Sequence, residues 1–480
     1  MKLSTRIAYN TIIQIASKVI STALGLFTIA VITRHLGALG FGQYTTALTF
    51  LSFFAIIADL GLTLVTVQMI SREGADEEIV LGNLLALRLV SALFFLGLAP
   101  LAVLFFPYEP VVKISVLVAS FSFLFVALNQ ILVGLFQKHL RMDKASIAEI
   151  ISRIVLLVGV IAVIRMGYSL VSILIITVVS SLVSFLMHYF FSRSFVRIKF
   201  RFDILYWRQI IKMSWPLAIT IALNLLYLKT DTLLLSIIKR PTEVGIMTEV
   251  GLYGAAYKVI DVLITLPFMF AGIILPILTK AWTNGNKEGF KNVLQRSFDV
   301  MVMLAVPMLI GTQFLAKDIM VLVAGEEFAL SGPILRILIL AAVMIFLGNM
   351  FAHAVIAIDK QKSIIKAYAF TAVTAVSGYF IFIPFFSYYG AAWVTIYSET
   401  AIALASALLV WKFTKFIPNF NVFFKSLMAS TVMGLLIYSL DFFHIYNFWA
   451  ALCLSPIVYF AFLYLFKGIK RQDIEILLNR

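Results

Sequence analysis

Long uninterrupted apolar runs constrain this chain more than any other feature of its sequence. Each run matches the roughly 20 residues that an α-helix needs to cross a bilayer. Of the 480 residues, 62% are hydrophobic and only 13% are charged, whereas a soluble domain is about half apolar and a quarter charged. A β-barrel would instead show alternating runs about ten residues long. We therefore predict an all-α polytopic membrane protein with about fourteen transmembrane helices.

The predicted spans form two series of six and a final pair. They lie near residues 11–33, 42–66, 81–106, 111–136, 147–165 and 168–190, then near 213–238, 251–279, 294–316, 333–357, 364–386 and 388–411, and lastly near 423–441 and 446–466.

The positive charges lie mostly on one side of these spans. With the N-terminus in the cytoplasm, 26 of the 38 Lys and Arg residues fall in cytoplasmic segments, 6 fall in outer segments and 6 fall within spans. Because cytoplasmic loops carry the excess of Lys and Arg, this asymmetry predicts a bacterial cytoplasmic membrane protein with both termini inside. It also accounts for the net charge of +15 without a nucleic-acid partner.

The longest cytoplasmic connection divides the chain. We expect an N-terminal six-helix lobe at 1–192, a cytoplasmic interfacial linker at 193–212, a C-terminal six-helix lobe at 213–412, and two additional transmembrane helices with a cytoplasmic tail at 413–480.

The linker has an amphipathic pattern. Residues 195–202 alternate apolar with basic side chains, and Asp203 is positioned to cap a short helix with apolar residues on one side (Ile204, Trp207, Ile210 and Ile211). This pattern is typical of a segment pressed against anionic lipid. A solvated basic loop fits it as well.

The two sixes resemble each other. Residues 41–47 (FGQYTTA) open the second span and residues 250–256 (VGLYGAA) open the eighth, and both read apolar-Gly-x-Tyr-x-x-Ala. Residues 143–146 (DKAS) follow the fourth span and 359–363 (DKQKS) the tenth. Six spans is an even number, so the halves share one orientation. This is a parallel repeat, which typically has its substrate site between the halves.

Motifs of enzyme chemistry are missing from the sequence. There is no Gly-rich phosphate loop ending in Lys and Ser or Thr, and no His-Glu-x-x-His metal motif. The five histidines are scattered, and Cys453 is the only cysteine. No loop is long enough for a soluble catalytic domain. We therefore expect a transporter rather than an enzyme, with no cofactor and no metal.

Ionisable residues inside spans are the strongest functional signal, because each central Lys, Arg or Asp costs roughly 2.5–3.5 kcal/mol to insert. They must pair, reach the interface or line a wet cavity. Arg88 is close enough to a span end to reach the interface, and it is also a candidate for substrate binding. The acids Asp59, Asp231 and Asp261 are candidates for ion coupling.

Three lysines point to an anionic substrate. Lys18 extends a polar stripe with Asn10 and Gln14 at spacings of four, while Lys229 and Lys258 interrupt the seventh and eighth spans. Lysine binds phosphate as a point charge, so these residues predict a cationic cavity between the lobes that holds a pyrophosphate head group. Structural pairing across helices is the alternative, and Lys258 could pair with Asp261 one turn away.

Several segments carry a family resemblance. Residues 36–44 (LGALGFGQY) with 57–62 (IADLGL) resemble the opening of the polysaccharide-transporter flippases, which include the O-antigen repeat-unit flippases. This family belongs to the multidrug/oligosaccharidyl-lipid/polysaccharide (MOP) exporter superfamily. Residues 230–235 (TDTLLL) and 251–258 (GLYGAAYK) look like its seventh and eighth spans. The resemblance covers most of residues 1–411.

The resemblance implies two six-helix lobes that work by alternating access. The implied cargo is an undecaprenyl-pyrophosphate-linked repeat unit, moved to the outer leaflet for cell-surface polysaccharide synthesis. The family's head-group role then falls to Lys18, Lys258 and Lys229. Besides its substrate and membrane lipids, the expected partners are a polysaccharide polymerase and other envelope-assembly proteins.

Two alternatives stay open at this point. One is a cation-coupled multidrug or toxin antiporter of the same superfamily, whose site should be acidic or apolar. The other is a non-transporting membrane scaffold of an envelope-assembly complex.

Overall fold

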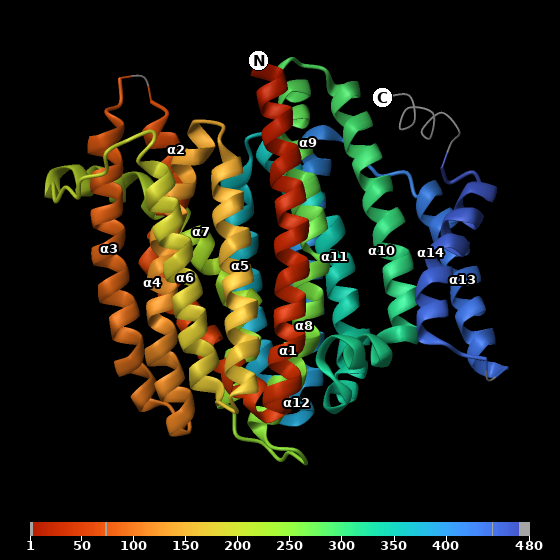
Figure 1. Cartoon of the computed structure of the whole chain (residues 1–480). Helices are drawn as coiled ribbons and strands as arrows, with labels where there is room; N and C mark the ends of the chain where they lie inside the picture. Colours follow the sequence, from red (N-terminus) through yellow and green to blue (C-terminus); the bar gives the residue numbers. More distant parts are fainter. Residues whose placement is uncertain (1–2, 73, 444, 470–480) are drawn as a thin grey trace. The chain divides into compact units, whose positions relative to one another are not determined.

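The computed structural model describes residues 3–72, 74–443 and 445–469, and the described residues contain helices and no strand (Figure 1). The helices are α1 (Leu3–Asp59), α2 (Leu62–Ile70), α3 (Glu77–Ala102), α4 (Pro110–Lys138), α5 (Met142–Arg165), α6 (Leu170–Ser192), α7 (Ile204–Ile237), α8 (Ile246–Leu263), α9 (Thr265–Thr283), α10 (Lys287–Ala324), α11 (Ser331–Ala357), α12 (Gln361–Thr414), α13 (Asn421–Phe442) and α14 (Phe448–Leu465), with short 3-10 helices η1 (Val103–Phe105) and η2 (Glu326–Leu330).

The all-helical membrane fold predicted from the apolar runs is confirmed. Eleven helical segments within the described ranges are long and apolar enough to cross a bilayer. Two of them each contain a junction between predicted spans at a non-helical residue. Gly37 in α1 lies between the first span and the second, which continues into α2, and Ser387 in α12 lies between the eleventh and the twelfth. The eighth predicted span is made of α8 and α9, and the seventh lies in α7.

The chain packs as two compact units. The first unit consists of residues 1–254 with 323–325, and the second of 255–322 with 326–480. The boundary between the units therefore lies inside α8.

The first unit has its core where α2, α3 and α4 meet the linker. Leu62, Leu84 and Leu135 are fully buried there, and Val196 of the linker and Ile210 of α7 pack into the same cluster. In Figure 1 the α2–α3, α4–α5 and α6–α7 connections of this unit lie at one end of its helices. These connections carry six Lys and Arg residues, whereas the other connections of this unit carry two, but which side of the membrane they face stays a prediction.

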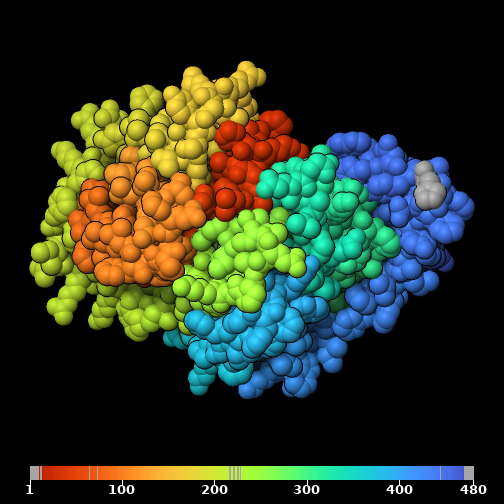
Figure 2. Space-filling view, turned by 90° about the horizontal axis from the view of Figure 1, so that it is seen from below, coloured from red at the N-terminus to blue at the C-terminus, as the bar shows by residue number. Residues whose placement is uncertain are grey.

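The opposite end of the first unit is tied together by loop contacts. The Tyr108 hydroxyl lies 2.7 Å from Ser236 Oγ, and Gln43 Nε2 donates to Glu109 Oε2 over 2.8 Å. Burial raises the pKa of Tyr108 to about 12, so its hydroxyl stays protonated. Figure 2 shows this end, with part of α1 (red), the α3–α4 connection (orange) and the residues near 240 (light green) side by side.

The repeated Gly-x-Tyr motifs meet each other. A Cβ on Gly42 would lie 1.7 Å from the Met247 carbonyl oxygen, and a Cβ on Gly251 would lie 1.9 Å from the Ala38 carbonyl oxygen. Each glycine thus faces the residue four positions before the other glycine, as a two-fold related helix pair requires. Only glycine permits this backbone approach, which explains why the motif occurs in both halves.

The second pair of repeated segments also occupies equivalent turns, but in a different register. Leu140 after α4 has φ 51° and Asp359 after α11 has φ 56°, and each is followed by one residue before the next helix begins. The structure therefore matches Asp359 to Leu140, three residues before Asp143. Alignment by residue identity alone therefore matched the wrong positions of these two turns.

The second unit is built around α9–α12 with the α13–α14 hairpin on its α10 side. Leu278, Phe290 and Val410 lie in its larger core cluster. The Tyr459 hydroxyl donates to the Met303 carbonyl of α10 over 2.8 Å. Tyr446, in the turn before α14, donates to Asp318, which also lies in α10. Burial and this acceptor raise the pKa of Tyr446 above its ordinary value, so the hydroxyl remains a donor.

Candidate functional site

A helix break in the first unit places a carboxylate in the protein interior. The helix α1 ends at Asp59, and the next two residues, Leu60 and Gly61, have φ values of 50° and 75° before α2 begins. Such a break leaves the last carbonyl groups of α1 without their intrahelical donors. It therefore creates an acceptor-rich site made of Asp59 and the nearby carbonyl of Ala58.

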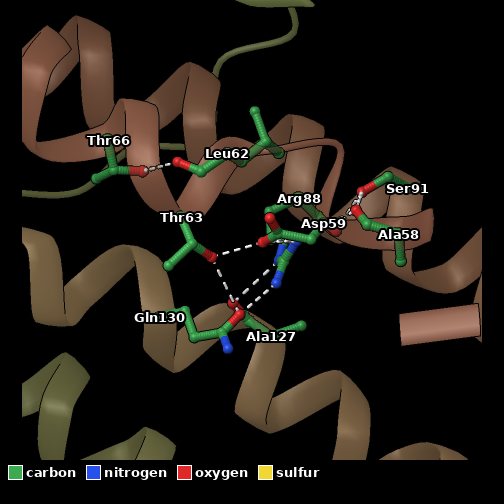
Figure 3. A network of polar contacts seen from close by, with 9 residues as sticks. All are labelled: Ala58, Asp59, Leu62, Thr63, Thr66, Arg88, Ser91, Ala127 and Gln130. Atoms are coloured by element: carbon green, nitrogen blue, oxygen red, sulfur yellow. Dashed lines mark hydrogen bonds and ion pairs between the residues drawn. The ribbon is translucent and has the colours of Figure 1, made fainter. Parts of the chain in front are cut away.

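Arg88 of α3 fills this acceptor site (Figure 3). Its guanidinium lies 2.6 Å from Asp59 Oδ1 and donates to the carbonyl oxygens of Ala58 and Ala127 over 3.2 and 3.1 Å. It also donates to Gln130 Oε1 over 2.5 Å. Only 2% of its side chain is exposed. Arg88 therefore does not extend to the interface, and a substrate could reach it only if these contacts were exchanged.

Three neutral side chains complete the cluster, which we call the Asp59–Arg88 network. Thr63 Oγ1 lies 2.5 Å from Asp59 Oδ1 and 3.2 Å from Gln130 Oε1, so its single proton can serve either oxygen. Ser91 Oγ donates to the Ala58 carbonyl over 2.8 Å. Figure 3 shows these groups converging from α1, α2, α3 and α4. The network therefore fixes the broken span against its two neighbours.

Sequence reasoning singled out Asp59 and Arg88 but missed Thr63, Ser91 and Gln130. The available signal was weak. Ser91 follows Arg88 by three residues and Thr63 follows Asp59 by four, so each pair shares a helix face or its continuation. Gln130 was an amide within a predicted span. Nothing in the sequence related the three positions to one another.

A second buried carboxylate lies between α7 and α8. Asp231 is fully buried, and it accepts hydrogen bonds from the Tyr253 hydroxyl over 2.7 Å and from the Thr232 backbone N–H over 2.5 Å. Tyr253 is the tyrosine of the second repeated motif. Lys229, two residues before Asp231, is half-buried. An ion-coupling role for Asp231 stays a prediction, and its visible contacts join the two helices.

Lys258 and Asp261 form an open ion pair on α8 in the second unit. Lys258 Nζ lies 3.5 Å from Asp261 Oδ2, and the two side chains are 37% and 32% exposed. By contrast, the Arg240–Glu249 pair of the first unit has a 2.5 Å contact and side chains at most 7% exposed. The predicted pairing of Lys258 with Asp261 is thus present, but it leaves both groups accessible.

Of the three residues in the predicted polar stripe on α1, one is buried and two are exposed. Asn10 is buried, and its side-chain oxygen accepts the backbone N–H of Met142 over 2.9 Å at the start of α5. Gln14 and Lys18 are exposed. Asn10 therefore joins two helices, whereas the Lys18 ammonium is accessible.

These features now have a family context. The profile of the polysaccharide biosynthesis protein family matches residues 7–282, which is more than half of the chain. The chain belongs to this family. No curated protein sequence matches it.

Solved structures of transporters share the fold of this family member. A structure titled as the lipid II flippase MurJ in an inward closed conformation superposes with a TM-score of 0.78 at 17% identity, covering 96% of this chain and 99% of that one. An inward-facing multidrug resistance MATE family transporter of the MOP superfamily gives 0.66 at 15% identity, covering 84% and 98%.

A third match is another transporter of the MOP superfamily. A MOP superfamily transporter from Pyrococcus furiosus, whose title reports reverse polarity of its binding pocket, gives a TM-score of 0.57 at 12% identity, covering 86% of this chain and 95% of that one. At these identities the likeness shows the fold alone. The polysaccharide biosynthesis family member described here therefore has the fold of the MOP transporters.

Proposed function

We propose that this protein is a flippase that moves a polyprenyl-pyrophosphate-linked oligosaccharide repeat unit, with undecaprenyl as the lipid, from the inner to the outer leaflet of a bacterial cytoplasmic membrane. The observation that carries the proposal is the combination of a polysaccharide biosynthesis family match with the fold of a lipid-linked flippase. The accessible lysines within the spans indicate a cargo with an anionic head.

The lysines bind the pyrophosphate in this proposal. Lys18 is exposed on α1, and Lys258 makes a long, half-open contact with Asp261. An ammonium group in such a pair can exchange its carboxylate for a phosphate with little loss of electrostatic energy. Lys229 is a third ligand for the head group. Arg88 contributes indirectly, by fixing the helix break.

An electrical driving force suits this chemistry. An anionic head moving outward across an inside-negative membrane gains about 2.3 kcal/mol per charge for each 100 mV. Ion coupling through Asp59, Asp231 or Asp261 would add to it. The lobes alternate in access, so the head group crosses while the lipid tail stays in the bilayer.

A cation-coupled antiporter is the second candidate, because MATE transporters share the fold. The buried acids Asp59 and Asp231 would be its coupling groups. The accessible lysines favour the flippase, since they would repel a cationic drug. A membrane scaffold that recruits a polymerase and other envelope-assembly proteins would need none of these spanning charges.

The test removes both accessible lysines, in the variant K18Q/K258Q, and measures polysaccharide at the cell surface of a strain that depends on this gene. We expect export to fall at least tenfold, and K18R/K258R to restore much of it. The variant K280Q/K362Q is the control, because it removes two exposed lysines outside the predicted spans. Full export by stably inserted K18Q/K258Q would overturn the proposed head-group site.

A further inference from the structure

The segment between α6 and α7 carries an exposed surface that combines apolar and basic side chains. The apolar members are Phe200, Phe202, Ile204, Leu205, Ile211 and Trp215, of which Ile204 and Leu205 are 76% and 75% exposed. The basic members, all exposed, are Arg197, Lys199, Arg201, Arg208 and Lys212. We call this set the linker surface.

The linker surface is held in place by the protein beneath it. A Cβ on Gly82 of α3 would lie 2.2 Å from the Lys199 carbonyl oxygen, so the linker backbone lies directly on that helix. Arg201 N–H donates to the Gly82 carbonyl over 3.3 Å, and Asp203 N–H donates to Asn83 Oδ1 over 3.1 Å. The exposed side chains are therefore presented by a fixed backbone.

The packing of this segment divides its apolar residues into two sets. The sequence pattern predicted Ile204, Trp207, Ile210 and Ile211 on one side of a short helix. In the structure Ile210 is fully buried and Trp207 packs against the same core cluster, whereas Ile204 and Ile211 are exposed. One apolar face is thus buried by the protein, and a second apolar face is left largely exposed.

The charge of the linker surface is unbalanced. Asp203 is the only acid between residues 193 and 215. Its carboxylate accepts the backbone N–H groups of Leu205 and Tyr206 over 3.0 and 3.1 Å and caps α7. It is therefore engaged by its own helix, and the five basic side chains form a field of one sign.

Figure 1 shows the first turns of α7 (yellow-green) lying across the helices of this unit, near the end that carries the α2–α3 and α4–α5 connections. A helix in this orientation, with apolar side chains beside basic ones, can sit in the headgroup region of a bilayer. Basic residues near an anionic membrane surface are each attracted to it. A soluble acidic protein would satisfy the charges but not the large apolar side chains between them.

From this combination we infer that the linker surface is a binding site for anionic lipid of the membrane leaflet beside it. The apolar side chains enter the acyl boundary, and the basic ones hold the negative head groups. The site is independent of the cargo and of the lysines in the spans. It couples the start of α7 to the lipid composition of that leaflet.

The experiment places an environment-sensitive fluorophore at L205C in the C453S background, which leaves one cysteine in the full-length chain. The labelled protein is reconstituted in nanodiscs that contain phosphatidylcholine and phosphatidylglycerol, with a doxyl quencher on the acyl chain of one lipid or the other. We expect the phosphatidylglycerol quencher to be at least about threefold more effective, reflecting local enrichment of anionic lipid.

Variants that remove positive charges test whether the basic side chains cause the local enrichment of anionic lipid. In R201Q/R208Q/K212Q the ratio of quenching by the two lipids should fall to near unity, while K280Q/K287Q/K362Q, which removes the same charge from exposed positions in the second unit, should leave it unchanged. Equal quenching by both lipids in the unmodified surface would overturn the inference. Absence of quenching by either lipid would overturn it as well, because the probe would then lie outside the acyl region.

Discussion

At the residue scale, burial of the Arg88 guanidinium is the most demanding feature of this protein. A charge that is 2% exposed within a span is tolerated because Asp59, two backbone carbonyls and Gln130 accept hydrogen bonds from it. Breaking a buried ion pair leaves an uncompensated charge, which typically costs about 3–5 kcal/mol. Replacing both partners by apolar groups removes that cost.

This difference gives a prediction for stability. R88M and D59L, made singly, should each lower the free energy of unfolding by about 3–5 kcal/mol, and the double variant should recover a large part of that loss. Thermal unfolding of the detergent-solubilised protein measures the effect, with the exposed-residue variant R165Q as control. Additive losses in the double variant would show that the two side chains do not act as a pair.

The Asp231 carboxylate gives a second prediction at this scale. The variant Y253F removes the hydrogen bond that joins α8 to this buried group, and it should destabilise the protein by about 1–3 kcal/mol, the usual cost when a buried acceptor loses its donor. Y397F, which removes a bond between two neutral hydroxyls at an exposed position, should have a much smaller effect. Chemical denaturation of both variants in one detergent compares them, and equal losses would contradict a special role for Tyr253.

At the scale of the elements, close backbone approach determines where the second and eighth spans cross. Gly42 and Gly251 each face a carbonyl oxygen of the other helix at a distance that admits no side chain. The repeated motif seen in the sequence therefore serves helix packing. Both copies are needed for the close approach, because each helix contributes one glycine and one carbonyl oxygen to the contact.

We predict that G42A and G251A each destabilise the protein by about 3 kcal/mol, because overpacking of a tight contact forces the backbones apart. G97A is the matched control, since a Cβ at this glycine of α3 would meet no atom within 4 Å. Alanine there should be neutral or stabilising, because glycine is a poor helix former. Unfolding temperatures near that of the parent protein for G42A and G251A would contradict the crossing described here.

At the scale of the whole molecule, the distribution of Lys and Arg predicts the orientation in the membrane. The first unit places its α2–α3, α4–α5 and α6–α7 connections at one end (Figure 1). Positive loops are retained in the cytoplasm, so this end should face inward. The proposed direction of transport depends on that orientation, and the orientation also decides which leaflet supplies the anionic lipid to the linker surface.

Cysteine labelling in the C453S background tests the orientation. Q209C in the first turns of α7 and S169C in the α5–α6 connection are both exposed positions at opposite ends of the unit. In intact cells a membrane-impermeant maleimide should label S169C and leave Q209C unmodified until the membrane is opened. The reverse pattern would refute the inside-positive assignment and with it the proposed topology.

The sequence by itself determined the class of fold, the positions of the spans and the existence of a repeat. Hydropathy and charge asymmetry are properties of the local sequence that determine membrane insertion and orientation. They can therefore be recognised without knowledge of tertiary contacts. The similarity of residues 41–47 to 250–256 was likewise evident from the sequence. The reason for that similarity, a reciprocal contact of two glycines, became evident only in the structure.

Only the tertiary structure decided which partner each buried charge takes. Arg88 was free to reach the interface, to bind a substrate or to pair, and the break after Asp59 brought carboxylate and carbonyl oxygens to it. Asn10 and Asp231 found their partners on other helices in the same way. The physical reason is that an apolar environment requires every buried polar group to be satisfied but does not specify by which residue. That choice depends on helix crossings and breaks, which arise from packing between segments far apart in the chain.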